Sequence, residues 1–116
     1  MKPAPFDYHA PATLDEAVAL LTRLEDEGCD MKIIAGGQSL MPMLALRVAR
    51  PEALVDLRRL DTLNYIRDEA DTLAIGAMTS KQAAADSALV RRAQPLFHAA
   101  TELVGHRQIR NRGSVG

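Results

Sequence analysis

A pair of glycines between two apolar stretches is the first place in this chain where the residue types suggest chemistry. Residues 31–35 form a short apolar run typical of a buried strand. Gly36 and Gly37 follow, ahead of a second apolar stretch with Pro42 near its start, which is typical of a helix. Glycines at such a junction allow a positive φ and a close approach to a ligand, and unpaired N–H groups there suit an anion such as phosphate. A tight turn without a ligand explains the same residues equally well.

A second glycine-containing stretch lies at residues 105–116 and is rich in positive charge. It holds three arginines, one histidine and three glycines, and it has no acidic residue. One interpretation is a frayed basic terminus, and the other is a second anion-facing loop in which Gly113 and Gly116 flank the Ser114 hydroxyl. Neither stretch has the GxGxxG or Walker A pattern, so a dinucleotide bound here would need a fold other than a Rossmann or P-loop domain.

No other set of side chains has the spacing of a catalytic or metal site. His9, His98 and His106 are not spaced as metal ligands, and no paired carboxylates or Ser/His/Asp set stands out. We therefore assign no catalytic residue and no metal ligand. His98 is interpreted as structural, and the single Cys29 as a small apolar residue in the packing.

Composition limits the classes of protein to which this chain can belong. Its 116 residues suit one domain, or two small lobes that share a ligand, with an aliphatic core because only 3% of residues are aromatic. A net charge of -1 argues against a nucleic-acid-binding protein. No apolar run approaches the length of a membrane span or resembles a signal peptide, so we expect a cytoplasmic protein.

Hydrophobic periodicity predicts short strands and helices in alternation. Thr13 and Glu16 form a capping-box pattern, and apolar residues at helical spacing follow as far as Gly28, with their face toward the core. Strands are expected over residues 6–9, 31–35 and 53–57, and a hairpin over residues 63–67 and 73–77 with an acidic turn between them.

The last third of the sequence predicts two more helices. Residues 79–82 repeat the capping-box pattern ahead of an alanine-rich helix, residues 87–92 read as an interruption, and Pro95 opens the next helix. Its expected apolar face comprises Leu96, Ala99, Ala100 and Leu103. The whole pattern predicts an α/β (α+β) fold with two lobes, residues 1–57 and 58–116.

The order of these motifs resembles one known family. AGGQSLMPML, the strand end at Asp56-Leu57, Ile75-Gly76-Ala77 and GHRQIRNRGSVG together resemble the medium, FAD-binding subunit of molybdenum hydroxylases. These are the carbon monoxide dehydrogenase and xanthine dehydrogenase-like enzymes, whose flavin domain belongs to the vanillyl-alcohol oxidase and p-cresol methylhydroxylase superfamily. The resemblance extends along all 116 residues and implies a two-lobed FAD-binding domain. The family's second motif continues with a further glycine, so the second lobe is expected to be incomplete and the chain to be truncated.

The resemblance also implies which residues contact FAD. In the family, the first loop holds the pyrophosphate through its N–H groups. The second motif, usually Arg-Asn-x-Gly-(Thr/Ser)-(Val/Ile)-Gly-Gly, lines the cofactor, and Ser114 replaces the commoner Thr here. The expected FAD-binding residues are therefore Ala35, Gly36, Gly37, Gln38, Ser39, Leu40, Asn111, Gly113, Ser114, Val115 and Gly116.

The activity implied by the resemblance is electron relay in an oxidoreductase. Electrons would pass from a molybdenum cofactor on a large subunit, through [2Fe–2S] clusters on a small subunit, to FAD and then to an acceptor. The chain alone is expected to bind FAD poorly and to be inactive. Two alternatives stay open, a stand-alone FAD-dependent reductase or oxidase of the same superfamily and a non-catalytic fragment or interaction module. Copurified iron and molybdenum would exclude the first, and visible absorbance of the purified chain would exclude the second.

Overall fold

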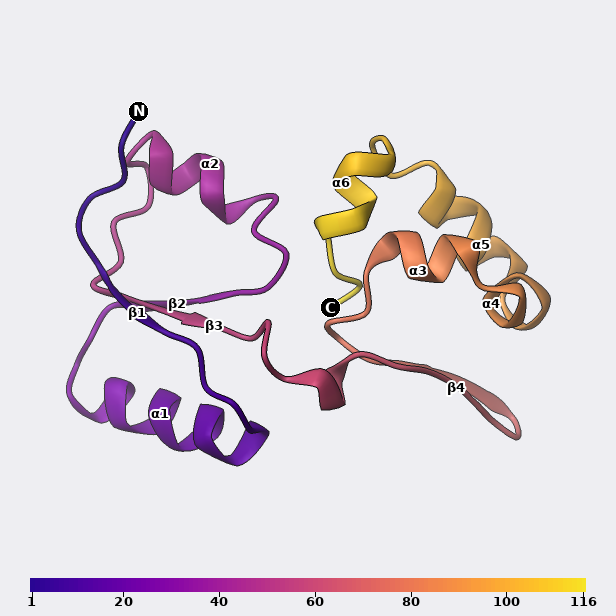
Figure 1. Cartoon of the computed structure of the whole chain (residues 1–116), viewed down its shortest axis with the longest axis horizontal. Helices are drawn as coiled ribbons and strands as arrows, with labels where there is room; N and C mark the ends of the chain where they lie inside the picture. Colours follow the sequence, from indigo (N-terminus) through magenta and orange to yellow (C-terminus); the bar gives the residue numbers. More distant parts are fainter. The chain divides into compact units, whose positions relative to one another are not determined.

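The chain forms two units in the computed structural model, which describes residues 1–116 (Figure 1). The first unit is Met1–Leu60 and the second is Asp61–Gly116. The sequence-based division after residue 57 lies slightly before this boundary. No helix in either unit is long and apolar enough to cross a membrane.

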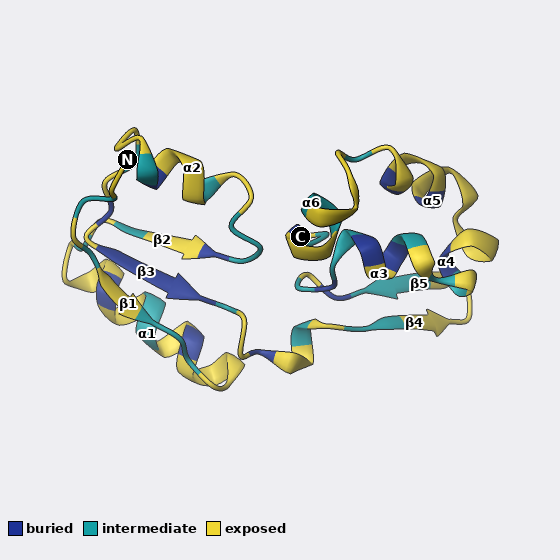
Figure 2. Ribbon diagram, turned by 45° about the horizontal axis from the view of Figure 1, so that its top comes forward, coloured by how far each residue is buried: buried dark blue, intermediate teal, exposed yellow.

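A three-stranded parallel sheet forms the centre of the first unit. Its strands are β1 (Asp7–His9), β2 (Met31–Ile34) and β3 (Ala53–Asp56), in the order β1-β3-β2. Asp7 of β1 and Met31 of β2 are both in register with Ala53 of β3. All four residues of β3 are buried, as Figure 2 shows, because this strand lies between two others and is covered on both faces.

Two helices cover the two faces of this sheet. They are α1 (Leu14–Asp26) and α2 (Leu40–Ala45). Alternate residues of a strand point to opposite faces, so Val55 packs against Leu24 of α1 and Leu54 packs against Leu44 of α2. The resulting layers confirm the predicted α/β character of the chain.

The predicted capping box of α1 is confirmed. The Thr13 hydroxyl accepts a hydrogen bond from the Glu16 N–H (3.1 Å), and the Glu16 carboxylate accepts one from the Ala12 N–H (3.1 Å). The predicted core face of the helix is narrower than expected, because Leu14 and Val18 are 47% and 54% exposed. Cys29, beyond the helix, is half-buried and packs against the cluster around Leu24, as predicted.

The second unit begins with a short 3-10 helix, η1 (Asp61–Leu63), and the hairpin of β4 (Ile66–Glu69) and β5 (Thr72–Ile75). The hairpin was predicted, but its first strand begins at Ile66, because residues 61–63 form η1 and the Tyr65 N–H donates to the Thr79 hydroxyl instead of to the partner strand. The turn is also tighter than expected. Only Ala70 and Asp71 lie between the strands, with Ala70 at a φ of 58°.

Four helices follow, and two of them were not predicted. They are α3 (Lys81–Asp86), α4 (Ala88–Ala93), α5 (Pro95–Glu102) and α6 (Arg107–Arg112). Residues 87–92, expected to be an interruption, form most of α4, whose N-cap Ser87 accepts the Val90 N–H (3.2 Å). Ser80 rather than Thr79 caps α3, because the Thr79 hydroxyl is bound to both the N–H and the carbonyl of Tyr65.

The predicted apolar face of α5 is wrong. Leu96 and Leu103 are 83% and 84% exposed, and the buried residues of this helix are His98 and Thr101. Both polar groups are paired, since His98 Nε2 lies 2.7 Å from the Ala85 carbonyl oxygen and the Thr101 hydroxyl donates to the Phe97 carbonyl (2.8 Å). Burial on this side follows from contact with α3 and α4, and it agrees with a structural role for His98.

Candidate functional site

The first glycine loop leaves the sheet at the carboxyl end of β2. Its backbone is fixed at Gly37, where φ is +78°, a conformation that side chains rarely adopt. A Cβ at this position would lie 3.1 Å from the Met41 side chain and 3.5 Å from that of Ile34. The Gly37 carbonyl accepts the Met41 N–H (2.9 Å), which ties the loop to the first turn of α2. Gly37 is therefore a position that requires glycine.

Unpaired donors are the main chemical feature of this loop. None of the backbone N–H groups from Gly36 to Leu40 donates to a backbone carbonyl, and Ser39 makes no side-chain cap. Residues 35–37 are half-buried, whereas Gln38 and Ser39 are exposed. Several neighbouring donors with no acceptor in the chain suit an anion with more than one oxygen.

A buried carboxylate lies at the same edge of the sheet, at the end of β3. Asp56 is 8% exposed and accepts hydrogen bonds from the Tyr8 hydroxyl (2.6 Å) and the Arg58 N–H (2.9 Å). The hydrogen bond to Asp56, with partial burial, raises the pKa of Tyr8. The next residue, Leu57, donates its N–H to the Ile34 carbonyl (3.1 Å) just before the glycine loop. Sequence patterns do not indicate that Tyr8 and Asp56 would meet, because they lie far apart in the chain.

The second glycine motif pairs with the segment that precedes α3. The Lys81 N–H donates to the Gly113 carbonyl (2.8 Å), and the Val115 and Gly116 N–H groups donate to the carbonyls of Thr79 and Ala77 (2.9 Å each). A Cβ on Gly116 would lie 2.7 Å from the Ala77 Cβ, so only glycine fits there. The interpretation as a frayed terminus is therefore wrong. The Gly113 N–H also donates to the Ile109 carbonyl (2.8 Å), so three N–H groups are already used and this segment has fewer donors for an anion than the first loop.

The arginines of this stretch mostly stabilise the fold of the second unit. The Arg110 guanidinium donates to the Gln82 side chain (3.0 Å) and to the carbonyls of Glu102 (3.1 Å), Val104 (3.3 Å) and Gly105 (3.3 Å). Arg107 lies 3.7 Å from the Asp86 carboxylate. Arg112 is exposed. The basic character that suggested an anion-facing loop therefore belongs largely to contacts of α6 with its neighbours.

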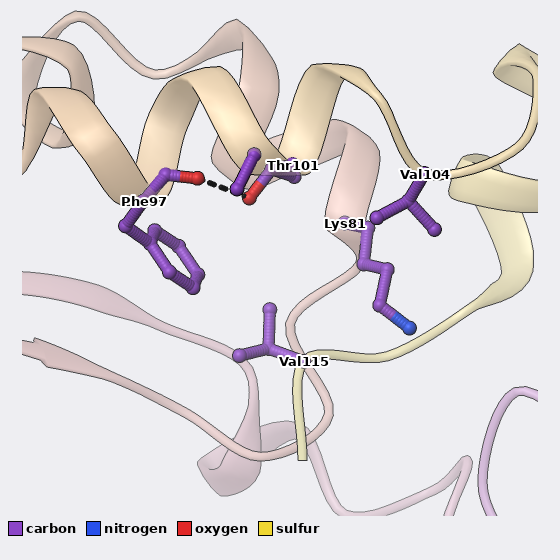
Figure 3. Close-up of a pocket in the computed structure, with 6 residues that line it drawn as sticks. Lys81, Phe97, Thr101, Val104 and Val115 are labelled. Atoms are coloured by element: carbon purple, nitrogen blue, oxygen red, sulfur yellow. Dashed lines mark hydrogen bonds between the residues drawn. The ribbon is translucent and has the colours of Figure 1, made fainter.

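The second unit also contains a small apolar cavity that the sequence did not predict (Figure 3). Its volume is about 160 Å³, and it is lined by Lys81, Phe97, Ala100, Thr101, Val104 and Val115. Val115 belongs to the second glycine motif, so the cavity and the motif share a wall. Phe97, Ala100, Thr101 and Val104 have helical spacing, but Lys81 and Val115 come from other segments, so the sequence alone does not reveal the cavity.

The residues expected to bind a cofactor thus form two groups. Ala35 to Leu40 lie together in the first unit, and Asn111 and Gly113 to Gly116 lie together in the second. Neither unit gathers three His, Cys, Asp or Glu side chains in the way that a metal site needs. The role of each residue as a ligand of FAD stays a prediction.

Comparison with known proteins gives matches over nearly the whole chain. Residues 4–116 match the family described as the FAD binding domain in molybdopterin dehydrogenase. The chain is 47% identical to the carbon monoxide dehydrogenase medium chain of Hydrogenophaga pseudoflava, with 100% of this chain and 39% of that protein covered. It is 40% identical to the caffeine dehydrogenase subunit beta of Pseudomonas sp. (strain CBB1), with 100% and 38% covered.

Solved structures give the same picture of the fold. Carbon monoxide dehydrogenase from Hydrogenophaga pseudoflava, in a form that lacks the Mo-pyranopterin moiety of the cofactor, matches with a TM-score of 0.93 and 46% identity. That match covers 100% of this chain and 39% of the solved chain. Quinoline 2-oxidoreductase from Pseudomonas putida 86 matches with a TM-score of 0.89 and 38% identity, over 98% of this chain and 39% of the other. This chain therefore spans about two fifths of the length of these relatives.

Proposed function

This chain belongs to the family of FAD-binding domains in molybdopterin dehydrogenases, and we propose on that premise that it holds FAD in the flavin subunit of a molybdenum-containing hydroxylase or dehydrogenase. The observation that carries the proposal is the row of unpaired N–H groups from Gly36 to Leu40. Such donors suit the two phosphates that link the halves of FAD.

The residues of both loops fit this cofactor in different ways. The first loop, Ala35 to Leu40, offers donors beside a glycine whose positive φ would strain any larger residue, and it would hold the pyrophosphate. In the second motif, Asn111 is exposed and Val115 faces the apolar cavity. The second motif would therefore line the cofactor mainly by van der Waals contact, through Asn111, Gly113, Ser114, Val115 and Gly116. FAD itself supplies the electron transfer, while the chain binds and orients it.

The wider role that we propose is electron relay within a complex. Electrons would reach FAD through [2Fe–2S] clusters on a small subunit, from a molybdenum cofactor on a large subunit, and leave to an acceptor. The relatives are named for different substrates, among them carbon monoxide, caffeine and nicotine, although they share 37–47% of their residues with this chain. We therefore expect a partner subunit, rather than this one, to select the substrate. The two units would be the two lobes of one FAD-binding domain, and the cytoplasmic location stays a prediction.

Gly37→Val tests the proposed pyrophosphate loop, and Gly28→Val is its matched control. Both glycines have a positive φ, +78° and +70°, so both variants carry a similar backbone strain. Only Gly37 lies in the loop. A hydrogen bond to a charged group contributes about 1.5–3 kcal/mol, so loss of one or more should weaken FAD binding about 10-fold to 100-fold. The dissociation constant of FAD, measured by titration of the apo-subunit that contains this chain, is the readout.

The control separates a local effect from a general loss of stability. Gly28→Val should lower the unfolding temperature, because Gly28 has a positive φ. It should not change the dissociation constant of FAD, because Gly28 lies outside the loop and a Cβ there meets no atom within 4 Å. Equal FAD affinity in the wild type and in Gly37→Val would refute the assignment of this loop.

A further inference from the structure

The outer face of α2 is apolar although it is exposed. Leu44 is the buried residue of this helix, and with about 3.6 residues per turn Pro42, Met43 and Leu46 lie on the opposite side. Met43 and Leu46 are 43% and 60% exposed, and Figure 2 shows α2 as largely exposed.

The end of α2 adds a fourth apolar side chain to this face. The Arg47 N–H donates to the Leu44 carbonyl (3.0 Å) and the Val48 N–H to the Met43 carbonyl (2.9 Å), which is the Schellman pattern. The pattern brings Val48 toward Met43, yet Val48 is 72% exposed. We refer to these four residues as the α2 face: Pro42, Met43, Leu46 and Val48.

Basic residues border the α2 face. Arg47 Nε donates to the Lys2 carbonyl (2.9 Å), and Arg50 Nε donates to the Arg47 carbonyl (3.0 Å), so three cationic residues lie next to one another. None of them pairs with a carboxylate, and residues 31–51 contain no Asp or Glu. A surface that neutralises this border must therefore bring carboxylates of its own.

Arg47 occupies a position where glycine would fit better. Its φ is 57°, in the left-handed region, and glycine is the usual residue at this place after a helix. Its side chain donates to an exposed carbonyl, a contact that adds little to stability. A charged residue kept in a strained conformation at the surface indicates a role outside the fold.

We propose that the α2 face docks a partner subunit whose contacting surface is apolar at its centre and rich in Asp and Glu at its rim. The inference rests on the proposed function, because it takes the chain to work within a complex. An apolar centre with a charged rim is typical of protein interfaces, and the rim sets orientation. Four apolar side chains on one short helix bury little in a bilayer, which favours a protein over a membrane.

Leu46→Glu places a carboxylate at the centre of the α2 face, and Leu14→Glu is its matched control. Both leucines are exposed, but Leu14 lies on α1. The complex is isolated from its own cells through a tag on the subunit that contains this chain. Its dissociation constant is measured by mass photometry on dilution, and its iron and molybdenum per subunit identify the partners. We expect Leu46→Glu to weaken association about 30-fold and to lose metal, and Leu14→Glu to match the wild type.

Arg47→Gly separates docking from folding. Glycine relieves the strained φ, so the unfolding temperature should not fall, whereas loss of a rim cation should weaken association about threefold. The salt dependence of the dissociation constant should decrease as well, because one charge pair across the interface is lost.

Wild-type affinity and metal content in Leu46→Glu would overturn the inference, and so would an equal loss in Leu14→Glu. Unchanged salt dependence in Arg47→Gly would overturn the carboxylate-rich rim. Binding to phosphatidylserine vesicles that Leu46→Glu abolishes, with metal content unchanged, would assign the face to a membrane instead. A wild type isolated without any metal-containing partner would refute the proposed function itself.

Discussion

Backbone geometry and close backbone contacts explain why glycine is needed at particular positions. The sequence alone shows that these residues are glycines but not why. At Gly37 the constraint is the positive φ, whereas at Gly76 it is space. A Cβ on Gly76 would lie 2.2 Å from the Leu63 carbonyl oxygen and 2.9 Å from the Tyr65 ring. The Gly76 N–H also donates to the Tyr65 carbonyl (2.8 Å), so the two segments cannot separate without loss of this bond. A glycine that looks optional in a strand pattern is thus required by a neighbour that is distant in sequence.

Gly76→Ala should destabilise the second unit. The new methyl group would overlap backbone atoms of Leu63, which cannot move aside as a flexible side chain can, and overpacking of this kind costs about 1–3 kcal/mol. The free energy of unfolding, from urea titration, is the measurement. Ala70→Gly, in the same unit, should have the opposite sign, because Ala70 has a φ of 58° and glycine relieves that strain. Equal stability of Gly76→Ala and the wild type would mean that the Leu63 backbone moves freely.

At the scale of the elements, α6 depends on tertiary contacts rather than on its own sequence. The helix has six residues and no side-chain cap, and it is not stable alone at this length. Arg110 joins it to Gln82 of α3 and to three carbonyls at the end of α5 and just beyond it. One guanidinium group thereby connects three helices. Its planar fork of donors suits this task better than a lysine ammonium does.

Arg110→Lys should therefore reduce stability, even though the charge is kept. A single ammonium cannot reach the Gln82 amide and the three carbonyls together, so we expect a loss of roughly 1–3 kcal/mol in the free energy of unfolding. Faster hydrogen exchange at the amides of α6 should accompany the loss. Arg112→Lys, on the same helix but exposed, should stay within about 0.5 kcal/mol of the wild type. Equal losses in both variants would show that the Arg110 contacts contribute nothing specific.

The sequence predicted best those elements that are determined by residues close together in the chain. The capping pair Thr13 and Glu16 defines the start of α1, and a continuous apolar run identifies β3. The two helices that it missed, α4 and α6, are only six residues long and pack against neighbouring helices. The face of α5 was reversed because His98 finds its acceptor at Ala85, which no helical period reveals. The first glycine loop was predictable from its residues, whereas Lys81 and the cavity arise only from tertiary packing.

At the scale of the whole molecule, both units leave large apolar residues exposed. The first unit has a buried cluster on each face of its sheet, but Leu46 and Val48 are 60% and 72% exposed. The second leaves Leu96 and Leu103 more than four fifths exposed and keeps an apolar cavity nearby. Exposed apolar residues grouped in this way are typical of surfaces that contact further protein. This property fits a chain that works within a larger assembly, as the proposed function requires.

The composition of the purified complex tests that assembly directly. We expect the subunit that contains this chain, when tagged and isolated from its own cells, to carry molybdenum, iron and FAD together. The chain gathers no three His, Cys, Asp or Glu side chains as metal ligands, so any stoichiometric iron or molybdenum must be held elsewhere in the complex. FAD without either metal would support a stand-alone flavin oxidase or reductase, and a colourless preparation would support an interaction module. Gly37→Val is the informative control. It should lose FAD but keep both metals, because the glycine loop holds the cofactor and not the partners. Loss of the metals together with FAD would show that the loop is part of the contact between subunits.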